Sequence, residues 1–108
     1  MSNLTAIVDA NRFKAMDDAS TCCKALAPVG DRWSGFGWHV RDIDGHNVAE
    51  ICSALDWASS QGDRPAVIVA HTVKGKGVPY WEERHAHYER EDVAKIGLAQ
   101  AREALKGR

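Results

Sequence analysis

The segment RPAVIVAHTVKGKG, residues 64–77, sets five consecutive apolar residues shortly before a loop with two glycines and two lysines. An uninterrupted apolar run of that length is typical of a strand buried on both faces of a parallel sheet. Gly75 and Gly77 permit close approach of the backbone to a ligand, so their N–H groups could point toward an anion. Lys74 and Lys76 would add positive charge, although the spacing is not that of a P-loop.

Further strands and helices are predicted from the apolar patterns around this segment. Short apolar runs predict strands at Leu4–Val8, Trp38–Ile43 and Ala66–Ala70, with Val73 extending the last of them. Helices are expected over Asp18–Leu26 (stopped by Pro28 and Gly30), over residues 48–60 and from Glu91 onward. Asn47 and Glu50 form a capping box for the second helix. Its predicted apolar face consists of Val48, Ile51, Cys52 and Leu55.

This order predicts an α/β fold with a partial parallel sheet and helices on both faces, because helices between strands imply right-handed crossovers. Three strands make an incomplete sheet, since the apolar first and third strands need cover on both faces and neighbours at their edges. We therefore expect residues 1–108 to be one part of a larger domain.

The composition is that of an ordinary globular chain, with 44% hydrophobic and 27% charged residues. A formal net charge of -1 argues against a surface for nucleic acid or for an anionic membrane. No apolar run reaches the roughly 18 residues of a membrane span, and no signal peptide is recognisable. The three cysteines form no disulfide framework and lack zinc-site spacing, so we expect reduced thiols and a cytoplasmic location.

Polar residues follow the end of each predicted strand, at Asp9-Ala10-Asn11, Asp44-Gly45-His46 and Thr72–Gly77. Ligands of open parallel sheets bind outside the carboxyl ends of the strands, so these segments predict a ligand site. Ordinary turns are the alternative, because Asp, Asn and Gly also favour turns. The Asn11 amide oxygen suits Mg²⁺, but a single asparagine is an incomplete metal site.

Three segments, in this order and spacing, resemble one known family: NLTAIVDAN (3–11), DRWSGFGWHVRDIDGHN (31–47) and RPAVIVAHTVKGKGVPYWEERHAHY (64–88). Nearly the whole chain resembles the thiamine-diphosphate-binding half of transketolases, specifically the second part of that domain. The resemblance implies an enzyme that transfers a two-carbon ketol unit from a ketose, a ketose phosphate or a related donor to an aldehyde acceptor.

The resemblance also assigns roles to individual residues. Asn11 matches the asparagine whose side-chain oxygen binds the metal ion, Mg²⁺ or Ca²⁺, and Phe13 matches a position whose backbone carbonyl is another metal ligand. Gly75 and Lys76 would lie beside the thiamine diphosphate. His87 matches a histidine that contacts the diphosphate or the donor substrate, where an imidazole suits proton transfer near neutral pH.

Other polar residues have competing structural explanations. His85 is the alternative to His87 in the HAHYERE segment. His39 is expected to be packed or hydrogen-bonded within a strand, His46 to be a turn residue, and His71 to be partly structural. Asp9 is expected to orient Asn11 or neighbouring loop atoms without binding the metal.

The chain departs from the family pattern in three places. Gly-Asp-Gly, which begins the family's diphosphate motif and supplies a metal-binding aspartate, is absent, and Met1-Ser2 would lie inside that motif. Met16-Asp17-Asp18 stands where the family usually has Asp-Gly, which restricts the turn and sets two carboxylates near the expected diphosphate. His87-Tyr88 replaces a common His-Gly, which would narrow that side of the pocket.

These departures predict one subunit of a split transketolase that is inactive alone. One partner chain would carry Gly-Asp-Gly, and another would carry the pyrimidine-binding and C-terminal domains. A non-catalytic accessory module, or a remnant of a transketolase-like protein, is the alternative. A fragment of a longer gene product is the third interpretation.

Overall fold

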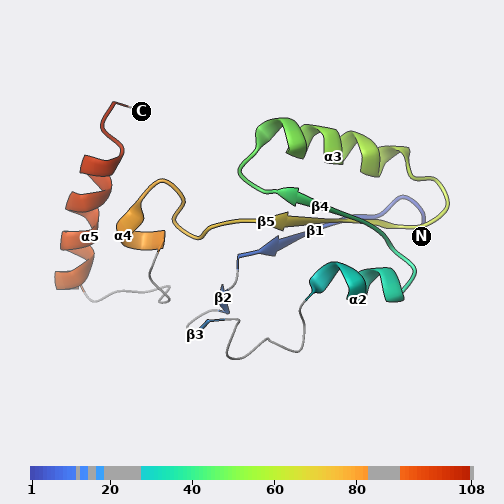
Figure 1. Ribbon diagram of the computed structural model, residues 1–108, viewed down its shortest axis with the longest axis horizontal. Coiled ribbons are helices and arrows are strands. Elements are labelled where there is room, and N and C mark those ends of the chain that lie inside the picture. Colours follow the sequence, from blue (N-terminus) through green and yellow to red (C-terminus); the bar gives the residue numbers. More distant parts are fainter. Residues whose placement is uncertain (12, 15–16, 19–27, 83–90, 108) are drawn as a thin grey trace. The chain divides into compact units, whose positions relative to one another are not determined.

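The computed structural model describes residues 1–11, 13–14, 17–18, 28–82 and 91–107 (Figure 1). Its elements in chain order are β1 Thr5–Ala10, β2 Phe13–Lys14, β3 Asp17–Asp18, α2 Val29–Gly35, β4 His39–Asp44, α3 Val48–Ser60, β5 Ala66–His71, α4 Pro79–Glu82 and α5 Glu91–Ala104. Contacts divide the chain into two compact units. The first consists of Met1–Asn11 with Ala25–Thr72, and the second of Arg12–Lys24 with Val73–Arg108.

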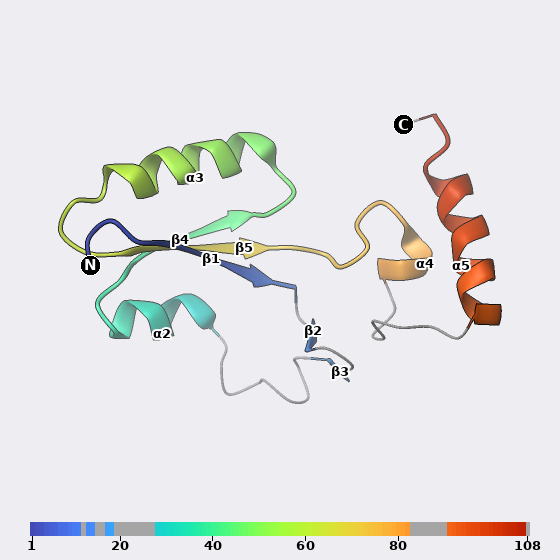
Figure 2. The same cartoon turned by 180° about the vertical axis from the view of Figure 1, so that it is seen from behind.

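The first unit is a three-stranded sheet in the order β1-β5-β4, with both pairs parallel. Helix α3 lies on one face of the sheet and α2 on the other, as both ribbon views show (Figure 1, Figure 2). The sequence prediction of an α/β fold with a partial parallel sheet and helices on both faces is confirmed. The long apolar run forms the central strand because only that position buries both of its faces.

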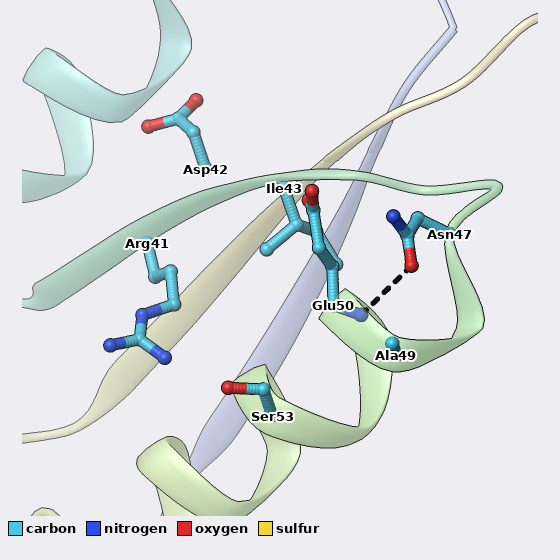
Figure 3. A pocket seen from close by; sticks show the side chains of 7 residues that line it. All are labelled: Arg41, Asp42, Ile43, Asn47, Ala49, Glu50 and Ser53. Atoms are coloured by element: carbon cyan, nitrogen blue, oxygen red, sulfur yellow. Dashed lines mark hydrogen bonds between the residues drawn. The ribbon is translucent and has the colours of Figure 1, made fainter.

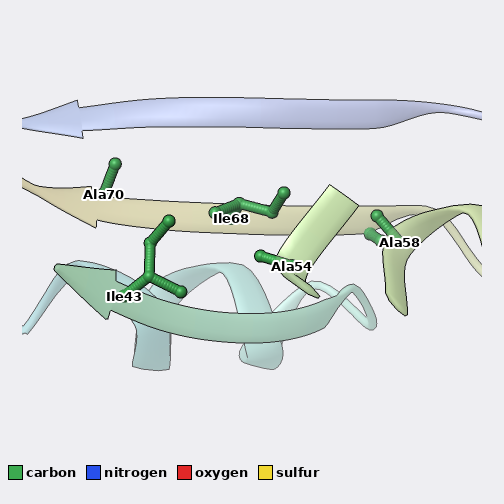
Figure 4. Close-up of a cluster of buried hydrophobic side chains, with 6 residues drawn as sticks. Ile43, Ala54, Ala58, Ile68 and Ala70 are labelled. Carbon is green, nitrogen blue, oxygen red and sulfur yellow. The ribbon is translucent and has the colours of Figure 1, made fainter. Parts of the chain in front are cut away.

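The core of the first unit lies between β5, β4 and α3 (Figure 4). Every residue from Ala66 to Ala70 is buried, and Val67 and Val69 have no exposed surface. On the α3 side, Ile68 packs in one cluster with the small side chains of Ala54 and Ala58. Alanines at this contact let the helix lie close to the sheet.

Helix α3 is confirmed at Val48–Ser60, but its predicted apolar face is only partly right: Ile51 packs against the core as predicted, whereas Val48, Cys52 and Leu55 do not. Glu50 N–H donates to Asn47 Oδ1 at 3.2 Å, as a capping box requires, while the Glu50 side chain accepts from Asp44 N–H at 2.8 Å instead of returning to Asn47. The buried face is centred on Ala54 and Ala58. Val48, Cys52 and Leu55 lie outside it, and Val48 is 72% exposed.

Helix α2 and strands β2 and β3 were not predicted from the sequence. Helix α2 begins at Val29, directly after Pro28, where a helix stop was expected; proline is tolerated there because the first N–H groups of a helix have no partner within it. Strands β2 and β3 form a two-residue antiparallel ladder that is too short to leave an apolar pattern. The helix expected over Asp18–Leu26 lies outside the described residues except for Asp18, which belongs to β3.

In the second unit, α5 is confirmed where a charged helix was predicted. Gly97 of α5 lies against the Tyr80 ring of α4, since a Cβ added at Gly97 would be 2.6 Å from Tyr80 Cε1. Val78 and Ala101 are the buried hydrophobic residues of this unit's described part.

Candidate functional site

The three parallel strands end at the same edge of the sheet, because Ala10 of β1 and Asp44 of β4 both lie opposite His71 of β5. The polar residues that follow β1 and β4, together with Thr72 after β5, therefore lie at one edge of the first unit, as expected. This is the edge at which open parallel sheets bind ligands.

Asp9 connects the ends of β1 and β5. Thr72 Oγ1 donates a hydrogen bond to Asp9 Oδ1, and Asn11 Nδ2 donates to Asp9 Oδ2 at 3.2 Å. Each carboxylate oxygen thus accepts one bond, and the Asn11 amide is oriented with its nitrogen toward Asp9. The expected contact of Asp9 with Asn11 is present, while its role beside a metal stays a prediction. We call Asp9, Asn11 and Thr72 the strand-end cluster.

The turn after β4 packs against this cluster. Gly45 N–H donates to the His71 carbonyl at 2.8 Å, and His46 N–H donates to Asp44 Oδ1 at 2.9 Å, which makes His46 a turn residue as predicted. A Cβ at Gly45 would clash with Thr72 Cγ2 and would lie 3.1 Å from the His71 oxygen. Glycine at this position therefore lets the turn approach Thr72.

Two further histidines pair with carboxylates. His71 Nε2 lies 2.8 Å from Asp42 Oδ1. His39 lies between Arg64 Nη2, at 3.2 Å from its Nδ1, and Asp63 Oδ1, at 2.7 Å from its Nε2. Because a guanidinium only donates, His39 accepts on Nδ1 and donates from Nε2. The hydrogen bond from His39 is the main cause that holds the pKa of the Asp63 carboxyl below its usual range. His39 is hydrogen-bonded, as expected.

In the second unit, the loop after β5 is a tight turn that uses its own N–H groups. Gly75 and Gly77 have φ angles of 72° and 92°, which favour glycine. Lys76 N–H donates to the Val73 carbonyl at 3.1 Å. Gly77 N–H donates to Glu82 Oε1 at 2.8 Å. The N–H group of Gly77 does face an anion, and that anion is the chain's own carboxylate.

The other predicted site residues are distributed as follows. Asn11 lies in the first unit, whereas Gly75 and Lys76 lie in the second. The backbone of Phe13 forms β2. His85 and His87 lie outside the described residues. Sequence reasoning missed Glu82, which no motif marks, and treated Thr72 only as part of a loop, although it is the first hydroxyl after β5.

A shallow depression between β4 and α3 is separate from the strand-end cluster (Figure 3). It is lined by Arg41, Asp42, Ile43, Asn47, Ala49, Glu50 and Ser53. The Arg41 guanidinium lies 4.8 Å from the centre of the Trp57 ring, at a cation–π distance. Asn47 and Glu50 are engaged in capping α3, so this depression contains none of the predicted cofactor residues.

Two features are absent from the described part of the chain. None of its helices is long and apolar enough to cross a membrane. No three His, Cys, Asp or Glu side chains in that part lie together as metal ligands.

Comparison with known families identifies the domain. The sequence model of the transketolase thiamine diphosphate binding domain matches residues 1–105. The chain belongs to the transketolase family. The resemblance noted in the sequence is thereby confirmed.

Several relatives carry names of transketolases or of their subunits. The 6-deoxy-6-sulfo-D-fructose transketolase subunit SqwG of Clostridium sp. (strain MSTE9) is 38% identical over 88 residues, which are 82% of this chain and 32% of that protein. A subunit of the apulose-4-phosphate transketolase of Phocaeicola vulgatus is 33% identical over 76% of this chain and 29% of its own length. Human transketolase is 35% identical over 80% of this chain and 13% of its own length. The chain thus spans about a third of these proteins or less.

Proposed function

We propose that this chain is the second part of a thiamine-diphosphate-binding domain in a split transketolase, which transfers a two-carbon ketol unit to an aldehyde acceptor together with partner chains. The match of residues 1–105 to the family's cofactor-binding domain carries the proposal. It is also supported by two relatives that are named as transketolase subunits. The ketose donor, the aldehyde acceptor and the partner chains are likewise proposed.

The strand-end cluster fits part of a metal–diphosphate site. An amide oxygen is an acceptable ligand for Mg²⁺ or Ca²⁺, and Asp9 would act on the metal only through the orientation of Asn11. The backbone carbonyl of Phe13 would be a second ligand. Two neutral oxygens do not complete a Mg²⁺ shell, so carboxylate and phosphate oxygens from outside the chain are required.

The cofactor performs the central chemistry of the proposed reaction. Bound thiamine diphosphate supplies the carbanion chemistry for breaking and forming the carbon–carbon bond. In the proposal, Asn11 and Phe13 hold the metal, Gly75 and Lys76 lie beside the diphosphate, and His87 moves a proton at the diphosphate or the donor substrate, with His85 as the alternative.

Partner chains supply what this sequence lacks. In the proposal, a partner chain with Gly-Asp-Gly would provide the metal-binding aspartate. A further chain would provide the pyrimidine-binding and C-terminal domains.

The experiment is the substitution Asn11→Ala in the complex reconstituted from this chain and its Gly-Asp-Gly partner. We expect assembly by native mass to be unchanged, while transfer activity is lost and thiamine diphosphate binds at least about 10-fold more weakly in the presence of Mg²⁺. Asn3→Ala, at an exposed asparagine, is the matched control and should change neither.

Either of two results would overturn the proposal. Full activity and unchanged cofactor affinity in Asn11→Ala would remove the metal-binding role of Asn11. A complex that assembles in the wild type but binds no thiamine diphosphate would identify this chain as a non-catalytic accessory module.

A further inference from the structure

Thr72, the residue directly after β5, contacts both neighbouring strands of the sheet through different atoms of its side chain. Its Oγ1 donates a hydrogen bond to Asp9 of β1, and its Cγ2 lies against Gly45 in the turn after β4. Because β5 lies between β1 and β4, the hydroxyl and the methyl group of Thr72 point toward opposite neighbours. A β-branched side chain is stiff about χ1, so the fit of its methyl group beside Gly45 directs the hydroxyl toward Asp9.

The hydroxyl makes the closer of two connections between Thr72 and β1. Near the start of the β1–β5 pair, Ala66 N–H donates to the Leu4 carbonyl at 3.0 Å, whereas Thr72 N–H lies 3.5 Å from the Ala10 carbonyl after its end. A distance of 3.5 Å exceeds the usual range of an N–H···O hydrogen bond. The side-chain bond to Asp9 therefore takes over where the backbone ladder between the two strands loosens.

Asp9 in turn determines how the Asn11 amide is oriented. An ionised carboxylate only accepts hydrogen bonds, so the Asn11 atom at 3.2 Å from Asp9 Oδ2 is the amide nitrogen. The amide oxygen of Asn11, which is the atom that a cation would bind, is thereby turned away from Asp9. The bond from Thr72 is made to the other oxygen, Oδ1, so it restrains the same carboxylate without competing with Asn11.

We propose that Thr72 is a positioning residue for the metal ion: its hydroxyl fixes the Asp9 carboxylate, which holds the Asn11 amide with its oxygen directed to the metal. This inference rests on the proposed function, in which Asn11 is a metal ligand. Thr72 acts through Asp9 and does not touch the metal. Outer-shell partners of this kind orient the ligands of metal sites and change their affinity.

A purely structural tie between the ends of β1 and β5 is the competing explanation of the same hydrogen bond. Such a tie would contribute to stability but would leave the Asn11 amide as it is. The geometry favours positioning, because the hydroxyl of Thr72 ends on the carboxylate that also accepts from Asn11. The two explanations therefore differ in what the loss of the hydroxyl does to Asn11.

The first test measures exchange of the Asn11 side-chain amide protons with water, by NMR on the full chain without cofactor. Thr72→Val keeps a β-branched shape but removes the donor, so the carboxylate can rotate and the amide protons should exchange about 5-fold faster. Thr72→Ser keeps a hydroxyl and should restore most of the protection. Thr5→Val, at an exposed threonine that begins β1, is the matched control and should leave Asn11 unchanged.

The second test measures the affinity of the reconstituted complex for thiamine diphosphate in the presence of Mg²⁺. Thr72→Val should bind about 10-fold more weakly, Thr72→Ser within about 2-fold of the wild type, and Thr5→Val like the wild type. Denaturant unfolding of each variant measures the structural contribution separately. A loss of stability in Thr72→Val with unchanged exchange at Asn11 would overturn the inference and make Thr72 a tie between strands.

Two further results would also overturn it. Thr72→Ser that behaves like Thr72→Val would show that the hydroxyl is not the cause, and equal effects of Thr72→Val and Thr5→Val would show that the position is not. The proposed function fails in a different way. Cofactor binding that is lost in Asn11→Ala but unchanged in Thr72→Val would refute the inference alone, whereas a wild-type complex without cofactor binding would refute the proposed function and the metal-directed role of Thr72 with it.

Discussion

The strand-end cluster and the loop at residues 73–78 both follow strands of one sheet, yet they satisfy their polar groups differently. In the cluster, side chains from two strands meet, and Asp9 orients the amide of Asn11. In the loop, Gly77 N–H is bonded to Glu82. In the first arrangement a carboxylate holds a side-chain amide in place, whereas in the second a backbone N–H is already bonded to the chain's own carboxylate. Glycine-rich sequence alone does not distinguish a cradle for phosphate from a turn closed by the protein's own carboxylate.

The close packing of Gly45 on Thr72 distinguishes the cluster from an ordinary turn. Gly45→Ala should destabilise the chain by about 2 kcal/mol, because the new Cβ displaces Thr72 and disturbs its bond to Asp9. Denaturant unfolding measures the change in the free energy of unfolding. Gly62→Ala, where no atom lies within 4 Å of the added Cβ, is the control and should change stability little. Equal stability of both variants would show that the turn does not depend on this approach.

The sequence pattern predicted the fold well where an element carries a strong local signal, such as a continuous apolar run or a helix cap. The run from Ala66 to Ala70 predicted a strand buried on both faces, and Asn47 with Glu50 predicted the start of α3. The pattern was only partly right for the buried face of α3: Ile51 packs against the core as expected, but two alanines lie at the centre of that face where large apolar residues were expected. Close packing of a helix on a sheet requires small residues at the contact, and the periodicity of large apolar residues does not reveal such positions.

The candidate site was predictable only in part. Ends of parallel strands share one edge, so Asp9, Asn11 and Thr72 could be expected near each other once the sheet was predicted. Glu82 could not, because its bond to Gly77 depends on the short helix α4, which no periodic pattern marks. The histidine assignment, on His87 or His85, rests on the family resemblance and remains a prediction.

Substitution of Asp9 tests whether the strand-end cluster positions Asn11 for the cofactor. Asp9→Ala should lower the affinity of the reconstituted complex for thiamine diphosphate with Mg²⁺ by about 10-fold, because the Asn11 amide loses the group that orients it. Isothermal titration measures the affinity. Asp56→Ala removes an exposed carboxylate on α3 instead and should leave the affinity unchanged. If both variants bind like the wild type, the cluster contributes no positioning.

Substitution of Glu82 tests whether the loop at residues 73–78, like the strand-end cluster, could take part in binding a ligand. Glu82→Ala removes the acceptor of the Gly77 N–H, so the chain should lose about 1 kcal/mol of stability. If the carboxylate occupies an anion site, the same variant should also bind inorganic pyrophosphate several-fold more tightly, since a negative charge is removed and an N–H is released.

Glu103→Ala is the control, because Glu103 is exposed on α5 and pairs only with Lys106 among the contacts described for its side chain. It removes the same charge without releasing a loop N–H group. A gain in pyrophosphate affinity confined to Glu82→Ala would make the loop a second anion site that the chain itself closes. A loss of stability without such a gain would make Glu82 a purely structural partner of Gly77, and the strand-end cluster would then be the more promising of the two regions for the cofactor.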